Sequence, residues 1–293
     1  MPCYHPISGY ITKGTTKSFT IHKPRTGKPF FEQTIPCGQC IGCRLERSRQ
    51  WAMRCMHESQ LHRESCFITL TYNNENLPAD GNLNKRDFQL FIKKLRFSLK
   101  NKRIRYYHCG EYGESLGRPH YHACLFGYNP KDLQLIKETG GIRLYISPSL
   151  EKLWGLGYVT VGQVTFESAA YVARYITKKI TGTQAENHYQ GRTPEYTTMS
   201  RRPGIGKPWL EQYQNDIYPK DFVTIREKKV KPPKYYDKLY EHRDPQGYLS
   251  IKIRRKLTGI SQAIDNTPER LQVKEAITQI NLNKLNRSYE HGT

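Results

Sequence analysis

The sequence predicts an α+β fold, in which helices pack on an antiparallel split βαβ sheet of the ferredoxin-like or RRM-like kind. Residues 66–72 form an apolar, β-branched run typical of a buried strand, and residues 84–99 carry apolar side chains at helical spacing. Two strands, a short helix and a last strand are then expected, in the order 103–111, 119–126, 149–154 and 157–164. Strand–helix–strand–strand–helix–strand is the order of a split βαβ motif.

The segments around this sheet divide the chain into three expected parts. Residues 1–62 would hold a Cys-rich element and a basic helix, after a loop-rich start over 1–36. Residues 63–215 would form the core, and residues 216–293 a basic C-terminal extension. Further helices are expected near 44–62, 131–138, 167–181 and 268–287.

The chain carries a large excess of positive charge, with a formal net charge of +21. Lys and Arg that neutralise phosphates release counterions, so this excess favours a nucleic-acid partner. Hydrophobic residues make up 37% of the chain and aromatic residues 12%, which argues against a mainly disordered protein. The sequence shows neither an apolar run of membrane-spanning length nor a signal peptide. We therefore expect no membrane partner, a cytoplasmic location and reduced cysteines.

Two histidines on one predicted strand indicate a metal site. Strand side chains alternate between faces, so His120 and His122 point the same way. If the two strands form a tight hairpin, Glu111 lies opposite His120 and Cys109 opposite His122, which places all of them on one face. Two imidazoles and a carboxylate can hold Mg²⁺ or Mn²⁺ beside a phosphate. Half-buried strand histidines without a metal are the alternative interpretation.

The helical segment near 167–181 carries two tyrosines that could act as nucleophiles. Tyr171 and Tyr175 lie one turn apart on one face, and Lys178 falls angularly between them. A separate apolar arc can dock on the sheet without the tyrosines, and consists of Ala169, Val172, Ala173, Ile176 and Ile180. A phenol can attack phosphorus to form a phosphotyrosine, and a nearby lysine favours the phenolate. Amphipathic packing of both tyrosines is the alternative interpretation.

Cysteines at metal-ligand spacing precede the first basic helix. Neighbours in this cluster are separated by two residues, at Cys37, Cys40 and Cys43. A tetrahedral structural Zn²⁺ site needs a fourth ligand, for which Cys3 is the first candidate and His5 the second. An iron–sulfur cluster fits less well, because Arg47 occupies the position where the bacterial pattern continues with cysteine. Free thiols in a loop are the remaining interpretation.

These segments resemble the three motifs of the HUH-superfamily rolling-circle initiators. The first motif is matched by 67–72, the second by 120–122, and the third by Tyr171, Tyr175 and Lys178. The stretch from Cys109 to His122 is similar to that of the replication initiators of microviruses, the small icosahedral single-stranded-DNA phages, and in particular of their gokushovirus branch. The resemblance covers roughly residues 1–215, including the segment 200–206.

The resemblance implies an HUH endonuclease core that nicks single-stranded DNA at the viral origin. A tyrosine becomes joined to the 5′ phosphate, the free 3′ hydroxyl primes synthesis, and the second tyrosine helps to religate a unit-length circle. Tyr171, Tyr175 and Lys178 match the family's catalytic residues, and the two histidines with Glu111 match its metal ligands. The implied partners are single-stranded or supercoiled origin DNA and the host helicase and polymerase, in the cytoplasm of the bacterial host.

Two other functions remain as alternatives. A non-catalytic RRM-like nucleic-acid-binding protein would stack bases on Tyr106, Tyr107, Tyr112 and Tyr121. A different HUH enzyme, a relaxase or a transposase, would share the metal site, but small transposases commonly carry one nucleophilic tyrosine.

Overall fold

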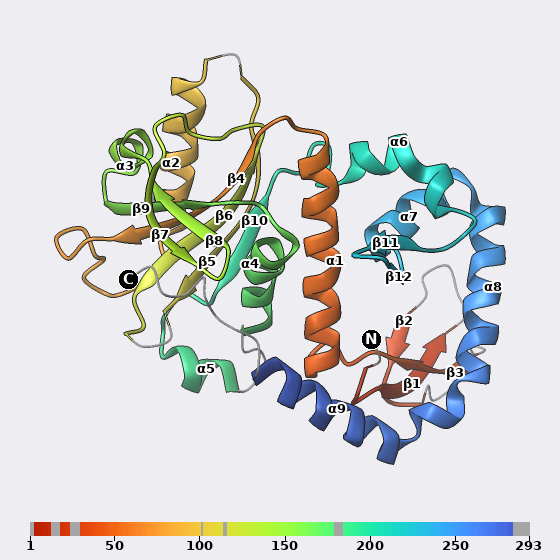
Figure 1. Cartoon of the computed structure of the whole chain (residues 1–293). Coiled ribbons are helices and arrows are strands. Elements are labelled where there is room, and N and C mark those ends of the chain that lie inside the picture. Colours follow the sequence, from red (N-terminus) through yellow and green to blue (C-terminus); the bar gives the residue numbers. More distant parts are fainter. Residues whose placement is uncertain are drawn as a thin grey trace. The chain divides into compact units, whose positions relative to one another are not determined.

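The computed structural model describes residues 3–12, 18–23, 30–100, 102–113, 116–178 and 184–283, with backbone alone for 174–178 and 184 (Figure 1). Two compact units make up the chain. Among the described residues, the smaller unit joins those up to Arg47 to those from Ile253 onward, and the larger unit comprises those of Ser48–Lys252. The division into three parts expected from the sequence, at 1–62, 63–215 and 216–293, stays a prediction.

The larger unit is built on an antiparallel sheet, to which the described residues contribute strands in the order β10-β5-β6-β4-β9-β8-β7. Its four central strands are β9 (Gly157–Gly162), β4 (Ser65–Tyr72), β6 (Pro119–Phe126) and β5 (Arg105–Tyr112). In sequence order these are the fourth, first, third and second strands, and every neighbouring pair is antiparallel. The predicted α+β class and the split βαβ strand order are therefore confirmed.

Three further strands widen this sheet at its two edges. β10 (Tyr196–Met199) pairs with β5, and the hairpin of β7 (Gln134–Thr139) and β8 (Ile142–Ile146) pairs through β8 with β9. The predicted helix near 131–138 is therefore wrong. Gly140 and Gly141 both have positive φ, at 58° and 78°, which is the backbone that a two-residue type I′ hairpin turn requires.

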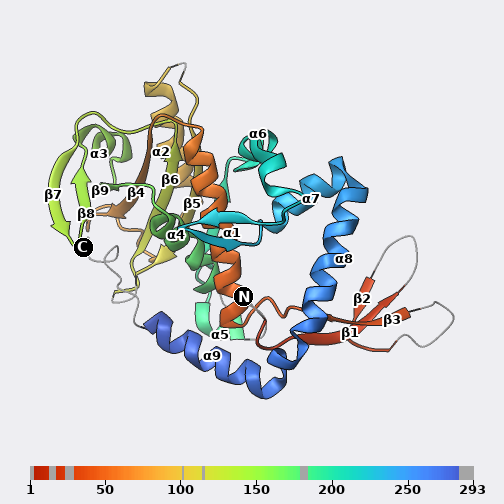
Figure 2. The same ribbon diagram turned by 45° about the vertical axis from the view of Figure 1, so that its right-hand side comes forward.

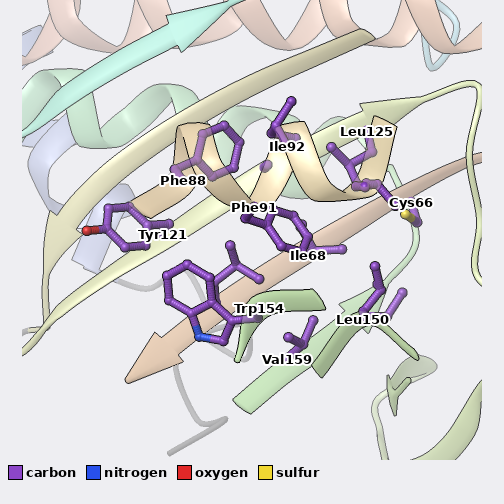
Figure 3. Packing of buried hydrophobic residues seen from close by; sticks show 14 of the residues in the cluster. Cys66, Ile68, Phe88, Phe91, Ile92, Tyr121, Leu125, Leu150, Trp154 and Val159 are labelled. Atoms are coloured by element: carbon purple, nitrogen blue, oxygen red, sulfur yellow. The ribbon is translucent and has the colours of Figure 1, made fainter. Parts of the chain in front are cut away.

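Two helices cover one face of the sheet and two cover the other. α2 (Lys85–Ser98) and α3 (Pro148–Trp154) pack on the face that carries Ile68, Tyr121 and Val159 (Figure 3). On the opposite face, α4 (Phe166–Lys178) and the part of α1 (Ile41–Gln60) in this unit pack on the alternate strand positions, such as Phe67 and Cys124. The second face is the one that holds the histidines.

A separate aromatic cluster completes the larger unit. It joins Met53 of α1 to the segment after β10, which contains α6 (Lys207–Ile217), β11 (Val223–Ile225), β12 (Lys228–Val230), α7 (Lys234–Arg243) and the start of α8 (Pro245–Ser261). α5 (Gln184–Tyr189) precedes β10. His57 of α1 stacks on Trp209 with ring centroids 3.5 Å apart, and the Arg54 guanidinium lies 3.9 Å from both the Trp51 and the Tyr235 ring centroid. These contacts fix α1 to α6 and α7.

The smaller unit contains a sheet with the order β2-β1-β3, formed by β2 (Ser18–Thr20), β1 (Ile7–Thr12) and β3 (Phe30–Ile35) (Figure 2). The expectation of a loop-rich start is wrong for these residues. Gly9 is the single buried residue in these strands, so the strands lack the buried apolar pattern on which sequence recognition depends. The unit also contains η1 (Ala263–Asn266) and α9 (Pro268–Asn283), the latter near the expected 268–287. In the described part of the chain, no helix is long and apolar enough to cross a membrane.

Candidate active site

The β5–β6 hairpin brings the predicted metal ligands together. Its register pairs Glu111 with His120 and Cys109 with His122, as predicted from the sequence. His108 falls on the other face, where its ring stacks on Phe88 with centroids 3.4 Å apart. A ring nitrogen of each site histidine and a carboxylate oxygen of Glu111 all lie within 4.8 Å of one another. The three side chains therefore converge on one point.

One oxygen of Glu111 lies between the two imidazoles. Its Oε1 is 2.8 Å from Nε2 of His120 and 2.7 Å from Nε2 of His122. Burial raises the pKa of this carboxyl, but His122 and His120 outweigh burial and hold the pKa below its ordinary value of 4.5. His120 is the member that water reaches, with 18% of its side chain exposed against 2% for His122 and 1% for Glu111. A ligand would therefore enter past His120.

The outer nitrogens of the histidines point at oxygen atoms. Nδ1 of His120 donates to the backbone carbonyl of Arg118 at 3.1 Å, and Nδ1 of His122 lies 2.8 Å from Oγ1 of Thr69. A carbonyl only accepts, so the Nε2 of a neutral His120 presents a lone pair toward Glu111. Two facing lone pairs need a proton or a cation between them.

The donor set fits a divalent cation. Among the described residues, Oε2 of Glu111 has no hydrogen-bond partner although it is buried. A buried carboxylate oxygen without a partner costs free energy that a bound cation would remove. Two imidazole nitrogens with carboxylate oxygen, from His120, His122 and Glu111, suit Mn²⁺ or Mg²⁺.

Thr69 and Phe67 of β4 support this centre, and the sequence alone did not identify these roles. The register pairs Thr69 with His122, and the Phe67 ring stacks on His122 with centroids 5.6 Å apart. Thr69 holds the imidazole by hydrogen bonding and Phe67 by packing. A signal was present in the alternation of Phe67, Thr69 and Thr71 on one strand face, but it becomes informative only when the neighbour of that strand is known.

Helix α4 brings Tyr171 to the histidines. α4 packs on β5 and β6, and the Tyr171 ring centroid lies 5.0 Å from that of His122, with the rings nearly perpendicular at 85°. The apolar arc docks as predicted where its side chains are described, with Ala169, Val172 and Ala173 fully buried. Tyr171 is also buried, with 4% exposed, because Phe67 and His122 extend the packing surface beneath it. It was expected to stand apart from the core.

The other members of the predicted tyrosine site are not described at side-chain level. Tyr175 and Lys178 belong to α4, but their side chains lie outside the described residues. The expected apolar residue Ile176 shares this limit, and Ile180 lies outside the described residues altogether. The structure therefore places Tyr171 beside the histidines and leaves the catalytic assignment of all three residues a prediction.

The smaller unit brings the predicted cysteine ligands together. The Sγ atoms of Cys3, Cys37, Cys40 and Cys43 all lie within 4.8 Å of one another. Cys3 Sγ is 3.5 Å from Cys37 Sγ and 3.9 Å from Cys40 Sγ. A tetrahedral ion with metal–sulfur bonds of about 2.3 Å separates its ligands by about 3.8 Å, so these distances fit Zn²⁺. His5 instead pairs with Glu275 at 2.7 Å.

Backbone amides favour the thiolate of Cys40 in this cluster, whereas burial raises the pKa of Cys3 and Cys43. The amides of Tyr4 and Cys40 donate to Cys40 Sγ and Cys37 Sγ at 3.3 and 3.2 Å. Burial raises the pKa of Cys40, but hydrogen bonds from the backbone at Cys43 and Tyr4 outweigh it and lower the pKa to about 6. Since the thiolate is the form that binds metal, this environment is compatible with a metal site.

Comparisons with known proteins agree on one family. The model of the replication-associated protein ORF2/G2P family matches residues 65–180, which include the hairpin and α4. The replication-associated protein VP4 of Bdellovibrio phage phiMH2K is 34% identical over 267 residues, 88% of this chain and 82% of that protein. ORF2 of Spiroplasma virus 4 is 34% identical over 221 residues, 71% of this chain and 68% of that protein.

A third relative matches over a shorter length. The replication-associated protein ORF4 of Chlamydia phage 1 is 34% identical over 185 residues, 60% of this chain and 46% of that protein. No solved structure matches the chain. On the length and identity of the first two matches, the chain belongs to the family of phage replication-associated proteins and is a microvirus-like replication initiator.

Proposed function

We propose that this protein is an HUH-type rolling-circle endonuclease that nicks single-stranded DNA at the viral origin and rejoins it. The observation that carries the proposal is the approach of Tyr171 to His122, at 5.0 Å between ring centroids, beside a convergent His–His–Glu cluster. A nucleophile and a cation site at one point are what phosphodiester transfer through a covalent intermediate requires.

The residues of the proposed active site would have separate roles in metal binding, nucleophilic attack and stabilisation of the phenolate. His120, His122 and Glu111 would hold Mg²⁺ or Mn²⁺, which when bound would supply a Lewis acid beside the scissile phosphate. The Tyr171 or Tyr175 oxygen would attack phosphorus and become joined to the 5′ phosphate, while the 3′ oxygen leaves and takes up a proton. Lys178 would favour the phenolate. The second tyrosine would repeat the transfer and close a unit-length circle.

The burial of aromatic side chains argues against the RRM-like alternative. Base stacking needs exposed rings, but Tyr107 and Tyr121 are fully buried, and Tyr121 is hydrogen-bonded to Tyr72 at 2.8 Å between the hydroxyl oxygens. Half of the expected stacking platform is therefore core. Membership of the phage replication family also favours an initiator over a relaxase or transposase.

The remaining expectations are part of the same proposal. The cysteine cluster would hold a structural Zn²⁺, on the evidence of its sulfur spacing. The partners would be single-stranded or supercoiled origin DNA and the host helicase and polymerase, in the cytoplasm of the bacterial host.

A cleavage assay with two DNA labels tests the proposal. The protein is incubated with single-stranded origin DNA and Mn²⁺ or Mg²⁺, and the products are separated under denaturing conditions. A 3′ label is expected to move with the protein, because the adduct forms through the 5′ phosphate, whereas a 5′ label is released on a shorter strand. Glu111→Gln is expected to lose cleavage and to retain salt-sensitive DNA binding.

Phenylalanine variants assign the nucleophile. Each of Tyr171→Phe and Tyr175→Phe removes one hydroxyl, and the double variant is expected to lose cleavage by about 10³-fold or more. Tyr158→Phe, at a tyrosine that is 62% exposed on β9, is the matched control and is expected to cleave normally. Cleavage by the double variant would overturn the nucleophile assignment. Failure of the unmodified protein with every divalent metal and a verified origin would overturn the enzymatic function.

A further inference from the structure

A cationic cavity lies at the end of β5 remote from Glu111. It has a volume of about 510 Å³ and is bounded by the C-terminal end of α2, the start of β5 and the residues that follow β10. Among the described residues that line it, seven of nine are Lys or Arg, and Ile104 is the single apolar member. The proposed nicking chemistry uses none of them.

Backbone carbonyls hold two of the arginines of this pocket in place. Arg103 donates to the carbonyl of Arg202 at 3.1 Å, and Arg105 donates to that of Pro203 at 2.7 Å. The segment that supplies these carbonyls is itself fixed to β5, because the Ser200 amide donates to the Tyr106 carbonyl at 3.0 Å. A guanidinium has five donors, so each arginine keeps others for a ligand. The site is therefore built before any ligand arrives.

The positive charge of the pocket is largely uncompensated. Arg105 pairs with the buried Glu58 at 2.5 Å, and Lys102 pairs with Glu64 at 2.6 Å. For the other five cations no carboxylate partner is found among the described residues. Arg201 and Arg202 are exposed on the segment after β10, and Arg202 contributes only its carbonyl to the contacts above. Such a concentration of cations would attract an anionic ligand of several charges.

The lining favours phosphates over stacked bases or a small apolar ligand. It contains no aromatic side chain on which a base could stack. Arg and Lys donors match phosphate oxygens. Recognition here would accordingly be independent of sequence.

We infer that this pocket is a second nucleic-acid site, which binds backbone phosphates of the DNA strand away from the position of cleavage. Arg105 and Glu111 are six residues apart on β5, which corresponds to about 20 Å at about 3.4 Å per residue. A stacked strand has one phosphate per about 3.4 Å, so stacked DNA that reaches both sites extends about six nucleotides beyond the nick. The identity of the strand, but not the binding itself, rests on the proposed function.

Paired charge-removal variants test the inference. The variant with both Arg201→Gln and Arg202→Gln removes two pocket charges while leaving the carbonyl of residue 202 in place. The control, Lys93→Gln with Lys94→Gln, removes two exposed charges of α2 that do not line the pocket. Binding of a fluorescein-labelled single-stranded origin oligonucleotide is followed by anisotropy over a range of NaCl, without added Mg²⁺ or Mn²⁺ so that cleavage does not interfere.

The pocket variant is expected to bind about tenfold more weakly, and its slope of log Kd against log salt is expected to fall by about 1.4, or about 0.7 for each lost phosphate contact. The control should keep the slope of the unmodified protein. Shortening the DNA flank should weaken binding to the unmodified protein and leave the pocket variant unaffected. Equal slopes for variant and control would overturn the inference, as would saturation of the pocket by inorganic phosphate without any effect on DNA binding.

These outcomes are separable from those of the nicking assay. Equal salt slopes for the pocket variant and the control, with normal adduct formation, would refute the pocket alone. A pocket-dependent salt slope without any adduct would support the pocket and refute the endonuclease.

Discussion

Glu58 and Glu111 are buried carboxylates, each with 1% of its side chain exposed, but different groups compensate them. Glu58 accepts from the permanent cation Arg105 and, through Oε2, from the Gly206 amide at 2.7 Å. Glu111 faces two histidines, whose charge depends on protonation, and its Oε2 has no partner among the described residues. The first environment is complete and serves stability. The second is incomplete without a cation, which is why the two residues receive different roles.

Replacement of Glu58 by Gln tests the structural role. Burial raises the pKa of Glu58, but the hydrogen bonds from His62 and Gly206 and the charge of Arg105 outweigh it, so the pKa lies below 4.5. A carboxyl with a depressed pKa stabilises the fold above its ordinary pKa, and this stabilisation is lost as pH falls through the depressed value. Near neutral pH, Glu58→Gln should lower the free energy of unfolding by about 3–5 kcal/mol, because Arg105 is left buried and unpaired.

Urea unfolding at a series of pH values measures the difference in free energy of unfolding between the unmodified protein and Glu58→Gln. This difference should have its full value near neutral pH and decrease below about pH 4.5. Glu64→Gln is the control, because the Glu64 carboxylate pairs with Lys102 and Lys131 at the surface and such pairs contribute little. A difference for Glu58→Gln that does not change between neutral and acid pH would contradict the assignment.

At the level of elements, the helices and strands whose apolar residues repeat with a regular period could be predicted from the sequence. Strands whose side chains show little such repetition could not. The β5–β6 register followed from alternation and a short connection, and so did the convergence of Glu111 with the histidines. The β7–β8 hairpin was missed because short runs do not separate strand from helix, although Gly140-Gly141 was an available turn signal. The approach of Tyr171 to His122 is a packing contact between a helix and a sheet, which no local period specifies.

The start of β9 offers a test of how closely the backbones of β9 and β4 pack against each other. Gly157 has φ of 151°, and a Cβ there would lie 2.3 Å from the Thr71 carbonyl oxygen of β4. Gly157→Ala is expected to lower the free energy of unfolding by more than about 3 kcal/mol, because the clash is with backbone that cannot turn away. Gly140→Ala is the matched control. Gly140 also has positive φ but no atom within 4 Å of the added Cβ, so its cost should be about 1–2 kcal/mol. Chemical denaturation measures the free energy of unfolding of both variants. Equal losses for Gly157→Ala and Gly140→Ala would refute the steric explanation.

At the scale of the whole molecule, the cysteine cluster connects segments from the two ends of the sequence within one unit. Tyr4 donates its amide to Cys40 Sγ, and its hydroxyl lies 2.7 Å from Oγ1 of Thr278 on α9. Tyr4, Cys40 and Leu271 are buried together. The described part of this unit has few other buried apolar side chains, so a metal at the cysteines would supply much of its stability.

Removal of one cysteine ligand should therefore affect a helix more than two hundred residues away in sequence. Cys37→Ser is expected to lose one bound zinc per chain and to raise amide hydrogen exchange in Pro268–Asn283, because apparent zinc-binding energies of about 10–16 kcal/mol are coupled to folding. His5→Ala is the matched control, since His5 pairs with Glu275 and lies outside the four-sulfur group. It should keep its zinc and change exchange only near Glu275. Zinc loss in His5→Ala, or retention in Cys37→Ser with unchanged exchange, would show that the four sulfurs do not form the site.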